Sequence, residues 1–348
     1  MRLNKCKIAD MLRRQKRHIS FHTPGHKRAG ADITELSYSD NLLSPTGVIA
    51  EAERDVAEIL GASRTFFLTD GSTSGIFAMV YALRAAGVKK LAVPSGSHRS
   101  VFNACRVLNM DTVPIKQGYR RGIPVQPTGE DIAAALKQAD ALLLTSPDYY
   151  GNFPPLQEAK ELCGAAGKPF VIDGAHGAHL HFSEKHAGKF ADMWVDGAHK
   201  SLPALTQGAA VSAKGEKWAA RLFEGVRTFR TTSPSYPVLA SVEYAFRFPR
   251  NLKIEAAAEK TKRRVGAIEN GDWTKMVVPF GDRAQEAQAF LERHKVYPEF
   301  CDGNYLMFYF SPCTKMRELK KLVKLLDTVP RGEVGEQAGV IPIYSEDA

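Results

Sequence analysis

Short apolar runs alternate with helix-length amphipathic stretches between residues 64 and 213. We expect buried strands at residues 64–68, 90–93, 112–115, 141–145, 169–173, 193–196 and 208–212. Apolar residues at helical spacing predict helices at residues 74–86, 100–108 and 155–166, and Thr128 with Asp131 marks a capped helix start. Parallel strands need crossover helices, so this alternation predicts an α/β fold with a mostly parallel sheet.

The pattern changes after Tyr236. A helix-rich stretch is followed by two predicted strands, at residues 296–300 and 304–311, and by an amphipathic helix at residues 316–326. We expect a second, smaller α+β domain here. The predicted division is a basic N-terminal arm, a large domain and a small C-terminal domain, at residues 1–25, 26–235 and 236–348.

The formal net charge of the 348 residues is +9, and most of it lies at the start of the chain. Residues 1–28 hold nine of the 47 Lys and Arg but one of the 38 acidic residues. The remainder is almost neutral, so we expect no nucleic-acid partner. Leu3, Ile8, Met11 and Leu12 predict a short basic amphipathic helix, which we expect to pack on a partner subunit rather than on a membrane.

Cysteine use and hydropathy both indicate a cytoplasmic protein. The five cysteines are odd in number, and none forms a CxxC pair, which is typical of reduced thiols. Charges interrupt the N-terminal stretch, so it does not resemble a secretion signal. No run approaches the ~18 apolar residues that a membrane span needs, and we expect no membrane contact.

Polar residues follow five of the predicted strands, where ligands bind in open α/β sheets. These segments are residues 69–75, 95–98, 146–151, 173–176 and 197–201. Residues 70–75 place glycines and hydroxyls at a helix start, where free N–H groups favour an anion such as a phosphate. A helix capped by Ser or Thr is the simpler interpretation of this turn.

Two charged residues in these segments suggest chemistry. Asp173 ends an apolar strand, where a buried carboxylate needs a cation or several donors, although it could also be a structural cap. Lys200 lies in the small-residue context GAHKSLP; such a lysine usually reaches solvent, but a desolvated one can form a Schiff base. An aldehyde-bearing phosphate cofactor would require the anion cradle, the carboxylate and the lysine together.

The chain resembles the bacterial ornithine/lysine/arginine decarboxylase family in a series of ordered motifs over about residues 20–240. These are FHTPGHKRAG, DNLLSPTG, DGSTSG, SHRSVFNA, TSPDYYG, VIDGAHGAHLHF, AHKSLPALTQGA and RTTSPSY. The family has the aspartate aminotransferase fold, with a mostly parallel seven-stranded sheet in the large domain. The resemblance implies pyridoxal 5′-phosphate (PLP), decarboxylation of arginine, lysine or ornithine to an amine of polyamine metabolism, and a homodimer with shared active sites.

The same resemblance implies roles for individual residues. Lys200 would carry PLP as a Schiff base, Asp173 would pair with the pyridine nitrogen, and His98 would stack on the ring. His98 could instead be a surface histidine that begins a helix. Ala175 would pack behind the ring, and His176 would lie near the reacting carbon. Phosphate ligands would be Ser72, Thr73, Ser74 and His199, with Thr232 and Ser233 from the partner subunit, unless residues 230–236 are only a hydroxyl-rich linker.

Four departures from the family pattern concern the substrate side. Asp148 stands where the family usually has Thr, Gly174 where many members have Glu, and Gly197 where a small hydroxyl residue is common. The part from Tyr236 onward has 113 residues and lacks a proline-rich segment, so we expect a shortened C-terminal part. Asp148 is our candidate for facing a cationic substrate, with a solvated loop acid as the alternative.

Two other functions fit parts of the sequence. Asp173 is followed by His176, His179, His181 and His186, which would suit a metallohydrolase, but their spacing matches no strong metal motif, so we expect no metal. A non-catalytic PLP-fold protein, or a different PLP lyase or aminotransferase-like enzyme, is the other alternative. The identity of the substrate amino acid stays open.

Overall fold

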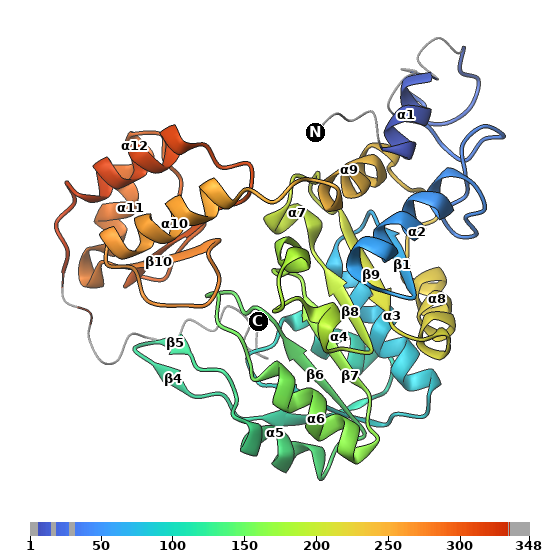
Figure 1. Cartoon of the computed structure of the whole chain (residues 1–348), viewed down its shortest axis with the longest axis horizontal. Helices are drawn as coiled ribbons and strands as arrows, with labels where there is room; N and C mark the ends of the chain where they lie inside the picture. The colour runs from blue at the N-terminus through green and yellow to red at the C-terminus, as the bar shows by residue number, and fades with distance from the viewer. Residues whose placement is uncertain (1–5, 15–18, 28–31, 333, 335–348) are drawn as a thin grey trace.

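The computed structural model describes the chain except for residues 1–5, 15–18, 28–31, 333 and 335–348. Figure 1 shows a large sheet with helices on both faces and, beside it, a smaller helix-covered sheet. The large sheet has the strand order β1-β9-β8-β7-β6-β2-β3. All its neighbouring pairs are parallel except those that β9 makes with β1 and β8. The predicted α/β fold with a mostly parallel sheet is confirmed.

The strands of this sheet agree closely with the predicted runs. They are β1 (Arg64–Leu68), β2 (Lys90–Pro94), β3 (Asp111–Ile115), β6 (Ala141–Thr145), β7 (Phe170–Gly174), β8 (Met193–Asp196) and β9 (Ala209–Ala213). Successive residues of β6 serve opposite faces: Leu142 and Leu144 enter one core, and Ala141 and Leu143 enter the other. Because a parallel sheet is buried on both faces, its strands are apolar at every position.

Helices cover both faces of the sheet. One face is packed by α2 (Val48–Leu60), α5 (Gly129–Leu136), α6 (Leu156–Ala166) and α9 (Tyr236–Phe246), and the other by α3 (Ser72–Ala85), α4 (Arg99–Val107) and α8 (Glu216–Phe229). The helix expected after Thr128 begins with a complete capping box: Thr128 accepts from the Asp131 N–H, and the Asp131 carboxylate accepts from the Thr128 N–H. Helix α2 lies outside the stretch in which we predicted elements.

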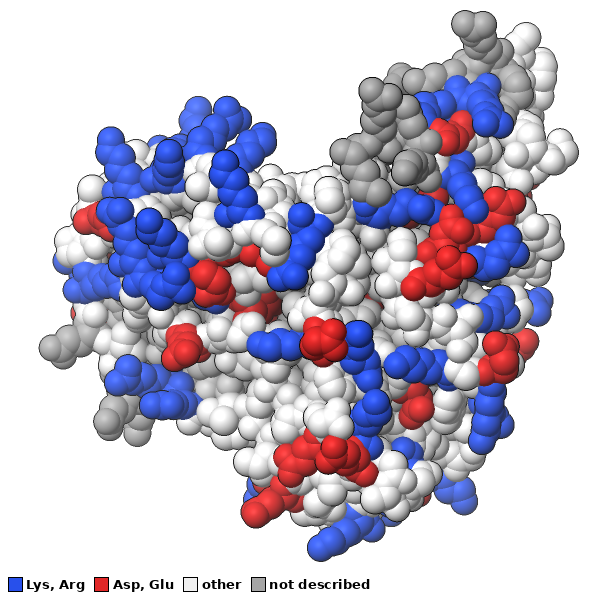
Figure 2. Space-filling model, in the orientation of Figure 1, with Lys and Arg blue, Asp and Glu red and all other residues white. Residues whose placement is uncertain are grey.

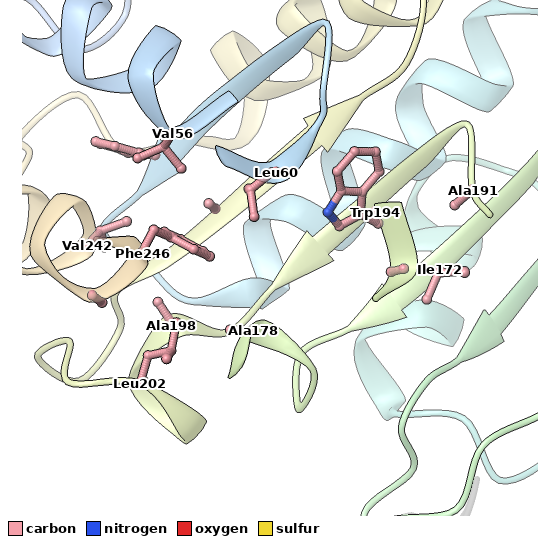
Figure 3. Packing of buried hydrophobic residues seen from close by; sticks show 14 of the residues in the cluster. Val56, Leu60, Ile172, Ala178, Ala191, Trp194, Ala198, Leu202, Val242 and Phe246 are labelled. Carbon is pink, nitrogen blue, oxygen red and sulfur yellow. The ribbon is translucent and has the colours of Figure 1, made fainter. Parts of the chain in front are cut away.

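Helix α9 belongs to the core of the large domain. Figure 3 shows Val242 and Phe246 of α9 in the same cluster as Val56 of α2 and Trp194 of β8. Trp194 is fully buried, and its indole N–H donates to Asp196 at 3.0 Å. The predicted boundary at Tyr236 is therefore too early, because the apolar face of α9 completes the first core and the second core begins with α10.

The small domain has its own three-stranded antiparallel sheet. Its order is β10 (Lys275–Pro279), β12 (Tyr305–Tyr309) and β11 (Phe300–Cys301), packed with α10 (Leu252–Arg264), α11 (Ala284–Arg293) and α12 (Met316–Leu326). Val277, Tyr305 and Met307 face away from these helices and contact Ile123 and Tyr150 of the large domain. The strand predicted at residues 296–300 is largely irregular, and β10 was not predicted.

A short hairpin of the large domain joins this contact. It consists of β4 (Tyr119–Arg120) and β5 (Ile123–Pro124), and the Tyr305 hydroxyl donates to the Arg121 carbonyl oxygen at 2.7 Å. The small sheet is thus anchored to the large domain by apolar packing and by a hydrogen bond.

The N-terminal amphipathic helix exists as α1 (Lys7–Arg14). Ile8, Met11 and Leu12 are buried in the large-domain core, against α2 and α9. The Glu243 carboxylate accepts from the backbone N–H groups of Lys7 and Ile8 at 2.8 and 3.0 Å. The helix therefore packs on its own chain, which corrects the expected packing on a partner subunit, and Leu3 lies outside the described residues.

Basic side chains gather on one face of the small domain, over α10 and α12 (Figure 2). Residues 247–331 contain 17 Lys and Arg against 11 Asp and Glu. The near-neutral total after residue 28 conceals this local excess, because the four acidic residues of positions 332–348 and a net charge of −1 over residues 29–246 offset it. No helix in the described part of the chain combines the length and apolarity that a membrane crossing requires.

Candidate active site

Five strands bring their carboxyl ends to one edge of the large sheet. β1, β2, β6, β7 and β8 run in the same direction, so the polar segments that follow them converge there. A cavity of about 1180 Å³ lies at this edge. Nine of the predicted cofactor and substrate residues line it, namely Ser72, Thr73, His98, Asp148, Asp173, Ala175, His176, His199 and Lys200.

The start of α3 forms one end of the cavity. Ser72 and Thr73 lie in the first turn, where the backbone N–H groups have no partner within the helix. The Ser72 hydroxyl is buried and has no hydrogen-bond partner among the described residues. Ser74 is turned away: its hydroxyl donates to Asp70 at 2.6 Å, and it does not line the cavity. The turn thus offers an anion site in which Ser74 supports the loop through Asp70.

Asp173 is a buried carboxylate at the floor of the cavity. It is 3% exposed, lies beside Thr145 in the β6–β7 register, and accepts from the Ala175 N–H at 3.1 Å. The Thr145 hydroxyl is also buried without a partner among the described residues. A carboxylate with so few donors is costly in this position unless a cation meets it.

Lys200 and His176 form a close pair in the cavity. Lys200 belongs to the short helix α7 (Ala198–Ser201), and its Nζ lies 3.1 Å from Nε2 of His176. Burial lowers the pKa of Lys200, although the Asp173 charge opposes this. Burial and the Lys200 charge hold the pKa of His176 well below its ordinary value. The imidazole is therefore neutral, and its Nε2 can accept a hydrogen bond from the lysine ammonium.

Two further histidines border the same space. His98 is the N-cap of α4, where its Nδ1 accepts from the Ser100 N–H at 3.2 Å. It begins a helix, as the alternative interpretation held, and its ring also lines the cavity. His199 places Nδ1 at 2.9 Å from the Gly208 carbonyl oxygen. Burial lowers the pKa of both rings.

Thr232 and Ser233 are exposed and are not among the residues that line this chain's cavity. The neighbouring Thr231 N–H donates to Asp70 at 3.0 Å, the carboxylate that also holds Ser74. The segment is therefore tied beside the first turn of α3, and its role toward a partner subunit stays a prediction.

Asp148 lines the cavity, as expected, but the chain's own donors occupy its carboxylate. The residue is 9% exposed, and its carboxylate accepts from the N–H groups of Tyr150 and Asn152 and from the side-chain amides of Gln126 and Asn152. Burial raises its pKa against these hydrogen bonds. It is therefore neither solvated nor free to pair with a substrate cation, because it organises its own loop.

The small domain supplies a carboxylate that we did not predict. Glu299, just before β11, is exposed and lines the cavity, and it accepts from the Tyr149 hydroxyl at 3.3 Å. Tyr149 and Tyr309 contact the His176 ring edge-on, with centroid distances of 5.5 and 5.9 Å. No local motif marks Glu299 or Tyr309, because the docking of the small sheet brings them to the site.

The two glycine departures have a steric cause. A Cβ at Gly197 would lie 2.3 Å from the Ala175 carbonyl oxygen, and a Cβ at Gly174 would lie 2.7 Å from the Val195 carbonyl oxygen. Larger residues at these positions would require the backbone behind the cavity to shift.

The histidines behind the metallohydrolase alternative have separate partners. His179 contacts Asp272 at 2.9 Å, His186 contacts Asp196 at 3.2 Å, and His181 contacts the Ala178 carbonyl oxygen at 2.9 Å. The described residues contain no group of three His, Cys, Asp or Glu that could hold a metal ion. The structure gives this alternative no support.

Comparisons with known proteins point to one family. The family model "Orn/Lys/Arg decarboxylase, major domain" matches residues 16–270. The arginine decarboxylase of Halalkalibacterium halodurans is 33% identical over 256 residues, which cover 65% of this chain and 51% of that protein. Among solved structures, the Francisella novicida lysine decarboxylase LdcF has a TM-score of 0.79 at 18% identity, covering 92% of this chain and 59% of that one.

A second structural neighbour is a structure of SPT with PLP, with a TM-score of 0.65 at 15% identity over 85% of this chain and 79% of that one. These likenesses confirm the fold. The chain spans 51% and 59% of the lengths of the arginine and lysine decarboxylases named above.

Proposed function

Because the chain belongs to the Orn/Lys/Arg decarboxylase family, we propose that it is a PLP-dependent decarboxylase of a basic amino acid. The observation that carries this proposal is the convergence of Lys200, Asp173 and the first turn of α3 on one cavity. An anion cradle, a buried carboxylate and a desolvated lysine are the three features that PLP requires.

The polar atoms of the cavity fit this cofactor. Ser72, Thr73 and the free N–H groups of α3 would hold the phosphate, since the Ser72 hydroxyl has no partner among the described residues. Asp173 would hold the protonated pyridine nitrogen, which supplies the cation that the buried carboxylate needs. Lys200 would bind the aldehyde carbon. When bound, PLP accepts the electron pair that remains on the α-carbon after carbon dioxide leaves.

His176 and Lys200 set the protonation state of the amine that binds the aldehyde. His176 Nε2 accepts a hydrogen bond from the Lys200 ammonium at 3.1 Å, and burial lowers the pKa of Lys200, which favours the neutral amine that acts as a nucleophile. The same pair can later return a proton to the α-carbon. Tyr149 and Tyr309 pack edge-on against the His176 ring and limit the access of water.

Glu299 supports a cationic substrate side chain. It is the exposed carboxylate on the small-domain wall, and its charge opposes the lowering of the Lys200 pKa by burial. Asp148 is saturated by its own loop, so Glu299 replaces it as our candidate partner for the ammonium or guanidinium of lysine, ornithine or arginine.

A panel assay tests the proposed function directly. The PLP-loaded protein should release carbon dioxide and the matching amine from at least one of arginine, lysine and ornithine. Borohydride reduction should fix the pyridoxyl group on Lys200, as shown by peptide mapping. PLP fixed on Lys200 without carbon dioxide release would favour the non-catalytic alternative, and labelling of another lysine would overturn the site.

We also propose a homodimer in which Thr232 and Ser233 complete the partner's site. A Lys200→Ala subunit and a Thr232→Ala/Ser233→Ala subunit should each be inactive. When they are refolded together, one site of the mixed dimer is intact, so activity should return. If verified mixed dimers stay inactive, the two hydroxyls do not act across the interface.

A further inference from the structure

A fully buried lysine lies behind the wall of the cavity, and the proposed mechanism does not use it. Lys275, the first residue of β10, has its Nζ 3.9 Å from the centroid of the Tyr309 ring. Its Nζ also donates to the Thr274 hydroxyl at 3.2 Å and lies 3.8 Å from Asp272 Oδ2. Lysine is almost never fully buried unless its charge is paired, so this arrangement needs an explanation.

The ring on which the ammonium rests also contacts an active-site residue. Tyr309 contacts the ring of His176 edge-on, and its hydroxyl donates to the Tyr149 carbonyl oxygen at 3.0 Å. His176 in turn lies 3.1 Å from Lys200. Tyr309 therefore contacts both Lys275 and His176, the partner of Lys200.

On the opposite side, Asp272 ties the lysine to the large domain. Its Oδ1 contacts His179 Nε2 at 2.9 Å and accepts from the backbone N–H and hydroxyl of Thr274. Burial alone would raise the pKa of Asp272, but the charges of His179 and Lys275 lower it below its ordinary value. The carboxylate is therefore ionised, and its charge opposes the lowering of the Lys275 pKa by burial.

Hydrogen bonds attach residues 270–275, which precede and begin β10, to neighbouring parts of both domains. The Asn270 side-chain amide donates to the Tyr150 carbonyl oxygen at 2.9 Å, and Lys262 donates to the Asp272 carbonyl oxygen at 3.0 Å. Residues 270–275 are thereby fixed to the loop that carries Tyr149. The charge behind Tyr309 thus has a defined position relative to the cavity.

We propose that Lys275 is a positioning residue, whose charge, held by Asp272, fixes Tyr309 against His176 and so orients His176 toward Lys200. A cation on a ring face restrains that ring, and proton transfer depends on the alignment of donor and acceptor. This inference rests on the proposed function for its catalytic meaning, although the geometry itself belongs to the protein without cofactor.

Electrostatics support the assignment. His176 faces Lys200, Tyr149 and Tyr309, and the charges of Lys275, Asp272 and His98 also act on it. After burial and Lys200, the positive charge of Lys275 is the next cause that lowers the pKa of His176. Lys275 therefore helps to keep the proton acceptor neutral.

The test compares Lys275→Met, which keeps the length without the charge, with Lys275→Arg, which keeps the cation on the ring. NMR of the histidine rings in the cofactor-free protein follows the protonation of His176. The His176 signal is identified as the one that is missing in His176→Gln. In Lys275→Met we expect His176 to protonate about tenfold more readily, a rise of about one pH unit. Lys275→Arg should stay close to the unchanged protein.

Tyr309→Leu supplies a second arm that keeps the buried charge pair and removes the ring. It should also change the His176 titration, and the effect of Lys275→Met should be smaller in this background than in the unchanged protein, because only the direct action of the Lys275 charge remains. An unchanged titration in Tyr309→Leu, or in folded Lys275→Met, would overturn the proposal, as would equal effects of Arg and Met at position 275. These readouts need neither PLP nor decarboxylation, so they stand apart from any failure of the proposed function.

Discussion

The two walls of the cavity are built in different ways. The large-domain wall consists of residues at or a few positions after the carboxyl ends of strands of one sheet, such as His98, Asp173 and Lys200. The small-domain wall consists of Glu299 and Tyr309, which reach the cavity because a second sheet docks there. A wall fixed by a buried sheet is suited to hold a cofactor rigidly, whereas a docked wall can differ between relatives and select substrates.

The walls also differ in burial. Asp173 is 3% exposed, whereas Glu299 is exposed to solvent. Charge interactions are strong in a low-dielectric environment and are weakened by water at a surface. Substitutions in the large-domain wall should therefore cost more than matched substitutions in the small-domain wall.

The largest effect is expected for Asp173→Asn. This change keeps the shape of the side chain but removes the charge that would stabilise the protonated pyridine. We expect kcat to fall about a hundredfold, corresponding to ~3 kcal/mol, with the fold preserved. Steady-state kinetics with circular dichroism checks this. A loss below about threefold would show that the large-domain wall does not act through this charge.

Asp148→Asn should affect stability more than substrate binding. An amide at this position must direct a donor toward either the side-chain amides of Gln126 and Asn152 or the backbone N–H groups of Tyr150 and Asn152. We expect unfolding to become easier by about 2 kcal/mol. Chemical denaturation measures this loss. If KM rose strongly while stability was unchanged, Asp148 and not Glu299 would be the substrate carboxylate.

Glu299→Gln tests whether the exposed carboxylate of the small-domain wall, rather than Asp148, binds the substrate cation. The exposed carboxylate interacts with a substrate cation through water-screened charge, so we expect KM for the basic substrate to rise about tenfold with kcat within a few-fold. The matched control is Glu184→Gln, whose side chain is 90% exposed and outside the cavity lining. Equal KM values for the two variants would remove Glu299 from the substrate site.

The contrast between the walls also explains how much the sequence could predict. The strands at residues 64–68, 141–145 and 193–196 were placed correctly, because a sheet buried on both faces leaves continuous apolar runs. Their polar ends could therefore be assembled into one site. Glu299, Tyr309 and Lys275 were missed because nothing local marks them, and only the docking of the small sheet brings them together.

Two further predictions, the domain boundary at Tyr236 and the packing of the N-terminal helix, were wrong because long-range packing determines both. Helix α9 has apolar side chains that fit either domain, and only the positions of Val242 and Phe246 beside Trp194 assign it to the large domain. The N-terminal helix was expected on a partner subunit. Glu243, far away in sequence, binds its first N–H groups and holds it on its own chain.

The smallest effect should come from a feature encoded within four residues, remote from both walls. Thr128→Ala removes half of the capping box of α5, in which the Thr128 hydroxyl accepts from the Asp131 N–H at 3.2 Å. We expect a loss of about 1 kcal/mol in the free energy of unfolding and unchanged kinetics. Thr128→Ser, which keeps the hydroxyl, should lose much less.

The pH dependence of this loss tests the cap itself. The Thr128 hydroxyl and N–H donate to Asp131 and lower its pKa in the folded protein. The contribution is present above the pKa that Asp131 has in the unfolded chain and is lost as pH falls through its lower folded value. The stability difference between the unchanged protein and Thr128→Ala should therefore shrink in acid. A difference that stays constant down to the lowest pH at which the protein folds would mean that the Asp131 carboxylate does not contribute to the cap.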